Sequence, residues 1–140
     1  MANAGASFNG SIFRKDYPMP IASGRQSALL FPVVLRYNSA GYVAGVVLAK
    51  NTTDGVWDAY NSGGSSGTGT ADCVLFESHA PEDFSSTSTA ASGSGLVAAV
   101  GIYGQCAVYK SLMTNYAAGV LTDLGARLIT DAQGQTVMKF

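Results

Sequence analysis

Few side chains in this sequence could support catalysis or bind a metal. His79 is the only histidine, and it lies in a segment that also holds Glu77, Glu82 and Asp83. A metal site needs two or three such ligands converging on one point, and one histidine among loop carboxylates is a weak signal for it. We therefore expect a solvated loop histidine. We predict no metal site and no cofactor.

The two cysteines offer a second chemistry, a Cys–His pair for nucleophilic catalysis. Cys73 and Cys106 both lie inside apolar runs and outside any CxxC pair, and neither has a cationic neighbour that would lower its pKa. We expect buried, reduced thiols that pack as small apolar groups, with a disulfide between adjacent strands as the alternative. We predict no catalytic residues and no enzymatic activity.

Trp57 and Tyr60 could stack on a ligand, although aromatic residues more often close a small core. The glycine-rich stretches lack the lysine of a phosphate-binding loop and do not open a helix. The chain has eight basic and nine acidic residues and no basic run. We therefore expect no nucleic-acid partner, because phosphate recognition requires clustered positive charge.

Two apolar stretches, residues 71–76 and 96–109, form the predicted centre of the fold. Both are apolar at nearly every position, which is typical of strands covered by protein on both faces. Gly101 and Gly104 interrupt the second stretch and indicate a bulge or the close approach of another backbone. These glycines and the short length argue against a transmembrane helix, so we expect no membrane partner.

The flanking elements are predicted as follows. Residues 27–37 and 42–50 form a hairpin around a turn at 38–41, with Pro32 at a sheet edge or strand start. Residues 51–70 form a loop with a flexible, glycine-rich end. Residues 77–95 connect the two central strands, and their second part, residues 85–95, is predicted to be exposed and mobile. Thr122 caps a short helix over 123–129, in which Leu124 and Leu128 share a face with Leu121, and a last strand covers 136–140. The fold class is mainly β with a short C-terminal helix.

The N-terminal segment, residues 1–26, differs in character from the rest of the chain. Pro18 and Pro20 exclude a regular helix or a central strand, and the large apolar side chains follow no period. Two interpretations stay open, a disordered tail and an extended arm that orders on a partner. The apolar anchors of such an arm are Phe8, Ile12, Phe13, Tyr17 and Met19.

Composition indicates one domain of 140 residues that buries surface against partners. Only 12% of the residues are charged and 47% are hydrophobic, with a net charge of −1, which is little charge for a soluble monomer. The N-terminus lacks the basic region and apolar core of a signal peptide. We therefore expect synthesis in a cytoplasm.

Four segments in this order resemble a known family. They are Gly45–Ala49 (GVVLA), Ala71–Leu75 (ADCVL), Ala107–Leu112 (AVYKSL) and Leu124–Ile129 (LGARLI). The pattern is similar to the tailed-bacteriophage head decoration proteins related to that of phage lambda, over residues 29–140. Its serine-, threonine- and glycine-rich loops and its N-terminal segment are longer than is usual in that family.

The resemblance implies a small β-barrel or β-tulip-like domain over residues 27–140 and an N-terminal arm over residues 1–26. It implies a structural virion protein that forms homotrimers on the capsid exterior. There the arm would contact the major capsid protein and cement neighbouring coat subunits. Two rival interpretations remain, a ligand- or carbohydrate-binding β-sandwich displayed on a virion or cell, and a small hydrolase with a Cys–His pair.

Overall fold

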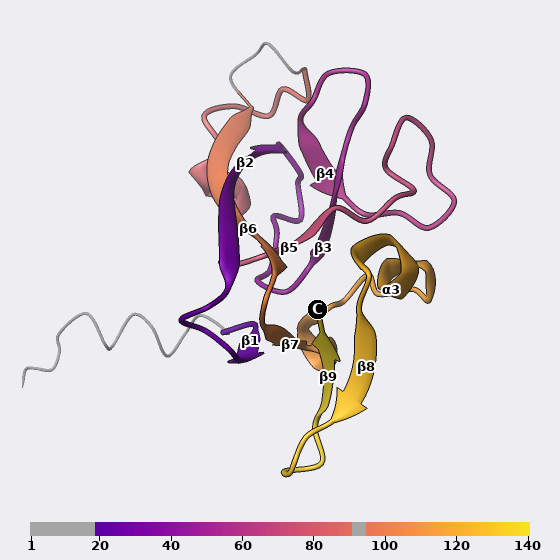
Figure 1. Cartoon of the computed structure of the whole chain (residues 1–140). Helices are drawn as coiled ribbons and strands as arrows, with labels where there is room; N and C mark the ends of the chain where they lie inside the picture. Colours follow the sequence, from indigo (N-terminus) through magenta and orange to yellow (C-terminus); the bar gives the residue numbers. More distant parts are fainter. Residues whose placement is uncertain (1–18, 91–94) are drawn as a thin grey trace, which may run out of the picture.

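The computed structural model describes residues 19–90 and 95–140, and two β-sheets dominate these residues (Figure 1). One sheet closes into a five-stranded barrel with the strand order β2-β4-β3-β5-β6. The other has four strands in the order β1-β7-β9-β8. This architecture confirms the predicted mainly-β class with a short helix near the C-terminus, and it shows a closed barrel.

The elements have the following bounds. The barrel contains β2 (Leu29–Arg36), β3 (Val47–Lys50), β4 (Trp57–Ala59), β5 (Cys73–Leu75) and β6 (Leu96–Gly104). The four-stranded sheet contains β1 (Ile21–Ser23), β7 (Ala107–Tyr109), β8 (Arg127–Thr130) and β9 (Thr136–Lys139). Two 3-10 turns, η1 (Pro81–Asp83) and η2 (Lys110–Leu112), and the α-helix α3 (Gly119–Leu124) complete the described fold.

The long apolar stretch 96–109 serves both sheets. The prediction of one strand is wrong here, because Gln105 adopts a positive φ of 59° and turns the chain between β6 and β7. The bulge indicated by the glycines is present. Leu29 lies opposite Gly104 and Leu30 opposite Ile102, so β6 carries one extra residue between them.

The close approach at Gly101 is to side chains, whereas the prediction named another backbone. A Cβ atom at this position would lie 2.7 Å from the Cys73 Sγ atom. The expectation that both central strands are covered on both faces holds only for β5, which is buried at all three positions. β6 is exposed at Ala98, so part of one of its faces is open to solvent.

The predicted hairpin between residues 27–37 and 42–50 is wrong. β2 pairs along its whole length with β6, whereas β3 pairs with β4 and β5. The turn itself is present, since the Gly41 N–H donates to the Asn38 carbonyl oxygen at 2.8 Å. The eight-residue β2 finds a partner for every residue in the long β6, and the four-residue β3 could not supply that pairing.

The predicted loop over residues 51–70 is more ordered than expected. Residues 51–70 include β4, and the glycine-rich part is held by backbone hydrogen bonds from Gly64 to Asn61 and from Thr68 to Ser65. This bonding differs from the freely flexible linker that composition suggests. In the connection after β5, Phe84 is buried and packs edge-on against Tyr37, with ring centroids 5.6 Å apart. Phe84 therefore anchors the first part of this connection to the core, and the part predicted to be exposed begins after it.

The predicted helix over residues 123–129 is wrong in its bounds. The observed helix α3 ends at Leu124, Gly125 with a positive φ of 61° is its C-cap, and the chain continues as β8. Thr122 therefore lies inside the helix, and Leu128 belongs to a strand. The turn at residues 133–135 and the last strand, β9, agree with the prediction.

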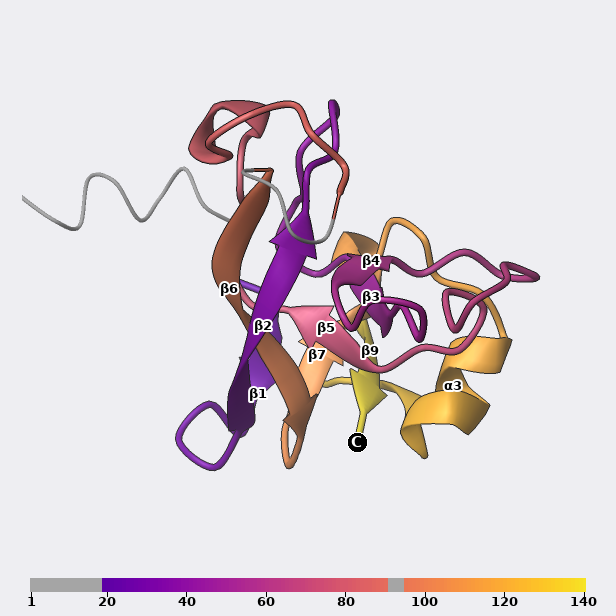
Figure 2. The same ribbon diagram turned by 90° about the horizontal axis from the view of Figure 1, so that it is seen from above.

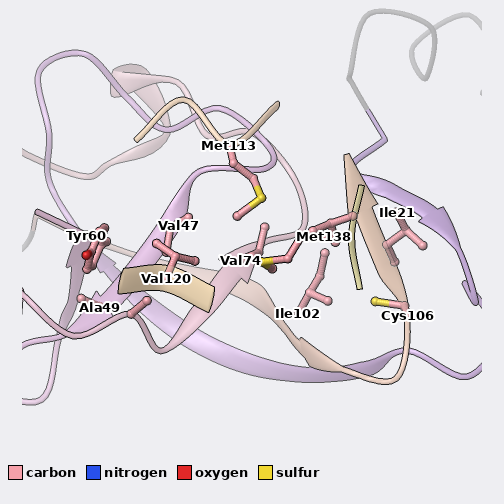
Figure 3. Packing of buried hydrophobic residues seen from close by; sticks show 12 residues of the cluster. Ile21, Val47, Ala49, Tyr60, Val74, Ile102, Cys106, Met113, Val120 and Met138 are labelled. Carbon is pink, nitrogen blue, oxygen red and sulfur yellow. The ribbon is translucent and has the colours of Figure 1, made fainter. Parts of the chain in front are cut away.

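Two clusters of buried residues form the core. One cluster contains Val33, Leu35, Leu48, Cys73 and Leu75, which come from the barrel strands. The other joins the barrel to the second sheet and to α3, with Val74 and Ile102 from the barrel, Met138 from the sheet and Val120 from the helix (Figure 3). The barrel and the four-stranded sheet therefore pack against each other through this second cluster.

The segment assigned to the N-terminal arm contributes to this core at its C-terminal end. β1 pairs with β7, with Ile21 opposite Val108, and Ile21 is only 6% exposed. Pro20 is among the fully buried side chains. The boundary predicted at Gln26 therefore lies within the fold, and the described domain includes residues from Met19 onward.

Candidate protein-interaction surface

β2 carries the largest group of exposed apolar side chains in the described part of the chain. Leu29, Leu30, Phe31 and Val34 are between 39% and 52% exposed. The alternation of side chains along a strand explains the exposure of Val34, because Val33 and Leu35 point into the barrel and Val34 points outward. The first four residues of the strand are exposed on both faces.

The neighbouring strand extends the same apolar character. Val34 lies opposite Ala98, and Pro32 lies opposite Val100. These β6 residues are exposed and partly exposed, respectively. We name the exposed apolar residues Leu29, Leu30, Phe31, Pro32, Val34, Ala98 and Val100 the apolar strip. By alternation, Leu29 and Phe31 lie on the other face of β2 from the rest of these residues. β2, which carries most of the strip, lies on the side of the molecule away from α3 (Figures 1 and 2).

The apolar strip includes an open backbone edge. On the side away from β6, β2 pairs within the described residues only through Leu35, opposite Trp57 of β4. The Val100 carbonyl oxygen accepts a hydrogen bond from the Phe76 N–H, next to β5 on the other side of β6, so it points away from β2. Pro32 and Val100 are therefore a non-hydrogen-bonded pair of the β2–β6 ladder. The Pro32 nitrogen therefore faces the open edge, which agrees with the predicted edge position.

Arg36 ends the apolar strip with a cluster of charges. Its guanidinium lies 2.6 Å from Asp54 and 2.8 Å from Asp58, and it also donates to the Thr89 carbonyl oxygen. The Arg36 hydrogen bond lowers the pKa of Asp54. This cluster ties the end of β2 to β4 through Asp58 and to the loops that hold Asp54 and Thr89, so a charged group closes the strip at this end.

The two aromatic residues considered for ligand stacking, Trp57 and Tyr60, make contacts within the fold instead. Tyr60 is buried, with 5% exposure. The Trp57 indole N–H donates to Asp72 at 2.8 Å, and the Lys50 ammonium lies 5.0 Å from the centre of the Trp57 ring. Both residues therefore close the core, which confirms the packing interpretation of the pair.

His79 differs from the predicted solvated histidine. Its backbone forms an isolated bridge with Tyr42, and its side chain is only 12% exposed. The Nδ1 atom lies 3.7 Å from Asp83, and the buried Nε2 atom has no hydrogen-bond partner within the described residues. The pairing with Tyr42 draws the histidine against the barrel, a long-range contact that loop composition does not reveal.

Both cysteines are free and buried, as predicted. Burial raises the pKa of the Cys73 thiol to about 12, and it also raises the pKa of Cys106. Burial therefore disfavours the thiolate that nucleophilic attack would require. No group of three or more histidine, cysteine or acidic residues that could hold a metal ion occurs in residues 19–90 and 95–140.

The predicted capsid-contact residues divide into two sets. Phe8, Ile12, Phe13 and Tyr17 lie outside the described residues. Met19 is partly buried and packs against the core cluster that joins the two sheets. Its side chain therefore contributes to the domain.

The apolar strip itself was not identified as a site from sequence. The run LLFPVVL in β2 has the composition of a strand covered on both faces. Its proline was the available signal, since proline is confined to edges and edges are where sheets meet partners.

The described residues contain no helix long and apolar enough to cross a membrane. Comparisons with known protein families, curated proteins and solved structures find no match to this chain. The apolar strip is therefore a candidate protein-interaction surface on the basis of its exposure and strand pairing alone.

Proposed function

We propose that this chain is a structural virion protein that binds the exterior of an icosahedral phage capsid and cements neighbouring subunits of the major capsid protein. The observation that carries the proposal is the apolar strip, whose seven apolar residues lie on the paired strands β2 and β6. A protein with such a surface and few charges is suited to assembly, because burial of apolar area drives association.

The two proposed contacts use different parts of the chain. The apolar strip buries itself against further copies of the chain in a homotrimer, since closed cyclic symmetry satisfies such a surface on every copy. The segment before Met19, with Phe8, Ile12, Phe13 and Tyr17, attaches to the coat protein. Each such side chain contributes roughly 1.5–3 kcal/mol when fully buried, and three arms per trimer bind together.

The test is binding to capsids of the phage that carries the gene. Purified protein is mixed with undecorated capsids, and the bound copies are located by electron microscopy and counted. Cementing predicts occupancy at every equivalent position of the shell and greater resistance of the decorated capsids to heat. Binding at a few positions only would favour a receptor-binding role and would contradict the proposal.

A further inference from the structure

β8 forms an open edge of the four-stranded sheet, on the right of the lower sheet in Figure 1. It pairs only with β9 among the described residues, and all four of its residues are exposed. Leu128 is 36% and Ile129 is 39% exposed, and they point to opposite faces because side chains alternate along a strand. The edge contains no proline, and its register with β9 is regular.

The hydrogen-bond pattern identifies which backbone groups face outward. The Asp131 N–H donates to Gln135 at 2.9 Å, which makes these two residues a hydrogen-bonded pair. Such pairs alternate along an antiparallel ladder, so Ile129 is also bonded to β9, whereas Leu128 and Thr130 direct their N–H and C=O groups away from it. These outward groups can pair with another strand.

The start of this edge carries two positive charges side by side. Arg127 lies directly opposite Lys139 on one face of the sheet, and like charges in this position destabilise a strand pair. Elsewhere among the described residues, Arg36 pairs with two aspartates, and Lys50 and Lys110 lie over aromatic rings. Arg127 and Lys139 have no acidic partner in that part of the chain. Arg25 is exposed in the turn before β2 and has no acidic partner among the described residues either, but it stands alone, without a second cation opposite it.

We propose that the β8 edge binds an extended segment of another polypeptide that carries acidic residues beside Arg127 and Lys139. The segment adds a fifth strand to the sheet through the outward groups of Leu128 and Thr130, and its carboxylates neutralise the two cations. This contact is separate from the apolar strip and does not depend on the proposed capsid function.

The experiment uses the full chain and a fluorescent nine-residue peptide of alternating threonine and valine with two glutamates at one end. A peptide with lysines in place of the glutamates is the control ligand. We expect anisotropy to show binding of the acidic peptide, and we expect Arg127→Glu/Lys139→Glu to weaken it by about tenfold, with weakening also at high salt. Arg25→Glu, which changes an exposed cation in the turn before β2, is the matched control and leaves the affinity unchanged.

A second variant tests the backbone contact. Thr130→Pro removes an outward N–H while keeping every hydrogen bond to β9, so it abolishes binding if the peptide adds as a strand. In the unchanged protein, the amide protons of Leu128 and Thr130 become protected from exchange when the peptide binds, which maps the contact even if the proline variant unfolds. Equal affinity for the lysine peptide, or no protection of these two amides, overturns the proposal. Displacement of the peptide by a single-stranded oligonucleotide also overturns it, because the cations would then bind phosphate.

Discussion

Gly101 and Cys73 show how one small residue sets the spacing of the barrel. β5 and β6 are paired neighbours, with Leu75 opposite Gly101, and the missing side chain at Gly101 makes room for the buried Cys73 sulfur. A methyl group at Gly101 would also lie 3.2 Å from Val33. The thiol therefore acts as a space-filling group at the place where glycine permits it.

We predict that Gly101→Ala lowers the free energy of unfolding by about 1–3 kcal/mol, because it overpacks the barrel. Cys73→Ala alone lowers it by about 1 kcal/mol through loss of a small apolar side chain. Because the alanine at Cys73 removes the nearest atom, the two changes together should cost less than their sum. Urea denaturation of the four proteins in the cycle measures this coupling, and strict additivity would contradict the contact.

The buried thiol also predicts a loss of stability in alkali. The unfolded chain releases the Cys73 proton near the ordinary pKa of about 8.5, whereas the folded protein keeps it up to about 12. The contribution of the protonated Cys73 thiol to the free energy of unfolding is therefore fully present below the pKa of the unfolded chain. It falls as pH rises above that value, by about 2 kcal/mol near pH 10. Cys73→Ala should flatten the fall in unfolding free energy between about pH 8 and pH 10. An unchanged slope in this variant would show that other groups cause the effect.

At the scale of elements, β1 decides where the domain begins. It is short and contains no strong pattern, yet it completes the edge of the four-stranded sheet and buries Ile21. Asn115 plays a similar part between elements. Its side-chain amide bonds the Val47 N–H and C=O groups and the Tyr60 carbonyl oxygen, so it joins the segment before α3 to the barrel.

We predict that removing residues 1–18 leaves the melting temperature nearly unchanged, whereas removing residues 1–26 lowers it by roughly 10 °C. The second deletion removes β1 and exposes the sites filled by Pro20 and Ile21, and about 2–3 kcal/mol of lost burial produces a shift of that size. Calorimetry of the two truncated proteins compares them directly. Equal melting temperatures would show that β1 contributes nothing to stability.

At the scale of the whole molecule, the apolar strip is the surface that a monomer would leave exposed to water. We predict a trimer in sedimentation equilibrium at micromolar concentration and a melting temperature that rises with protein concentration. Leu30→Glu/Val34→Glu changes two outward, already exposed side chains, so it should give a folded monomer. Val43→Glu, at a 50% exposed site outside the strip, is the control and should stay trimeric. A trimer that survives the double change would place the interface elsewhere.

The sequence alone determined the features that depend on local chemistry. The β class followed from valine-rich runs broken by glycine, the burial of both cysteines from their apolar neighbours, and the turns at residues 38–41 and 133–135 from glycine and asparagine. The edge position of Pro32 followed from its missing N–H. Each of these features is set by a residue and its immediate neighbours, which is why composition and spacing revealed them.

Only the tertiary structure decided which segments meet. β2 pairs with the distant β6 and leaves β3 to others, because strand pairing is chosen by matching length and buried faces across the whole chain. The same long-range choices placed His79 against Tyr42 and left one side of β2 uncovered. An apolar run has the same sequence pattern whether another sheet covers it or solvent does. The apolar strip and the open β8 edge could therefore be identified only from the pairing of all the strands.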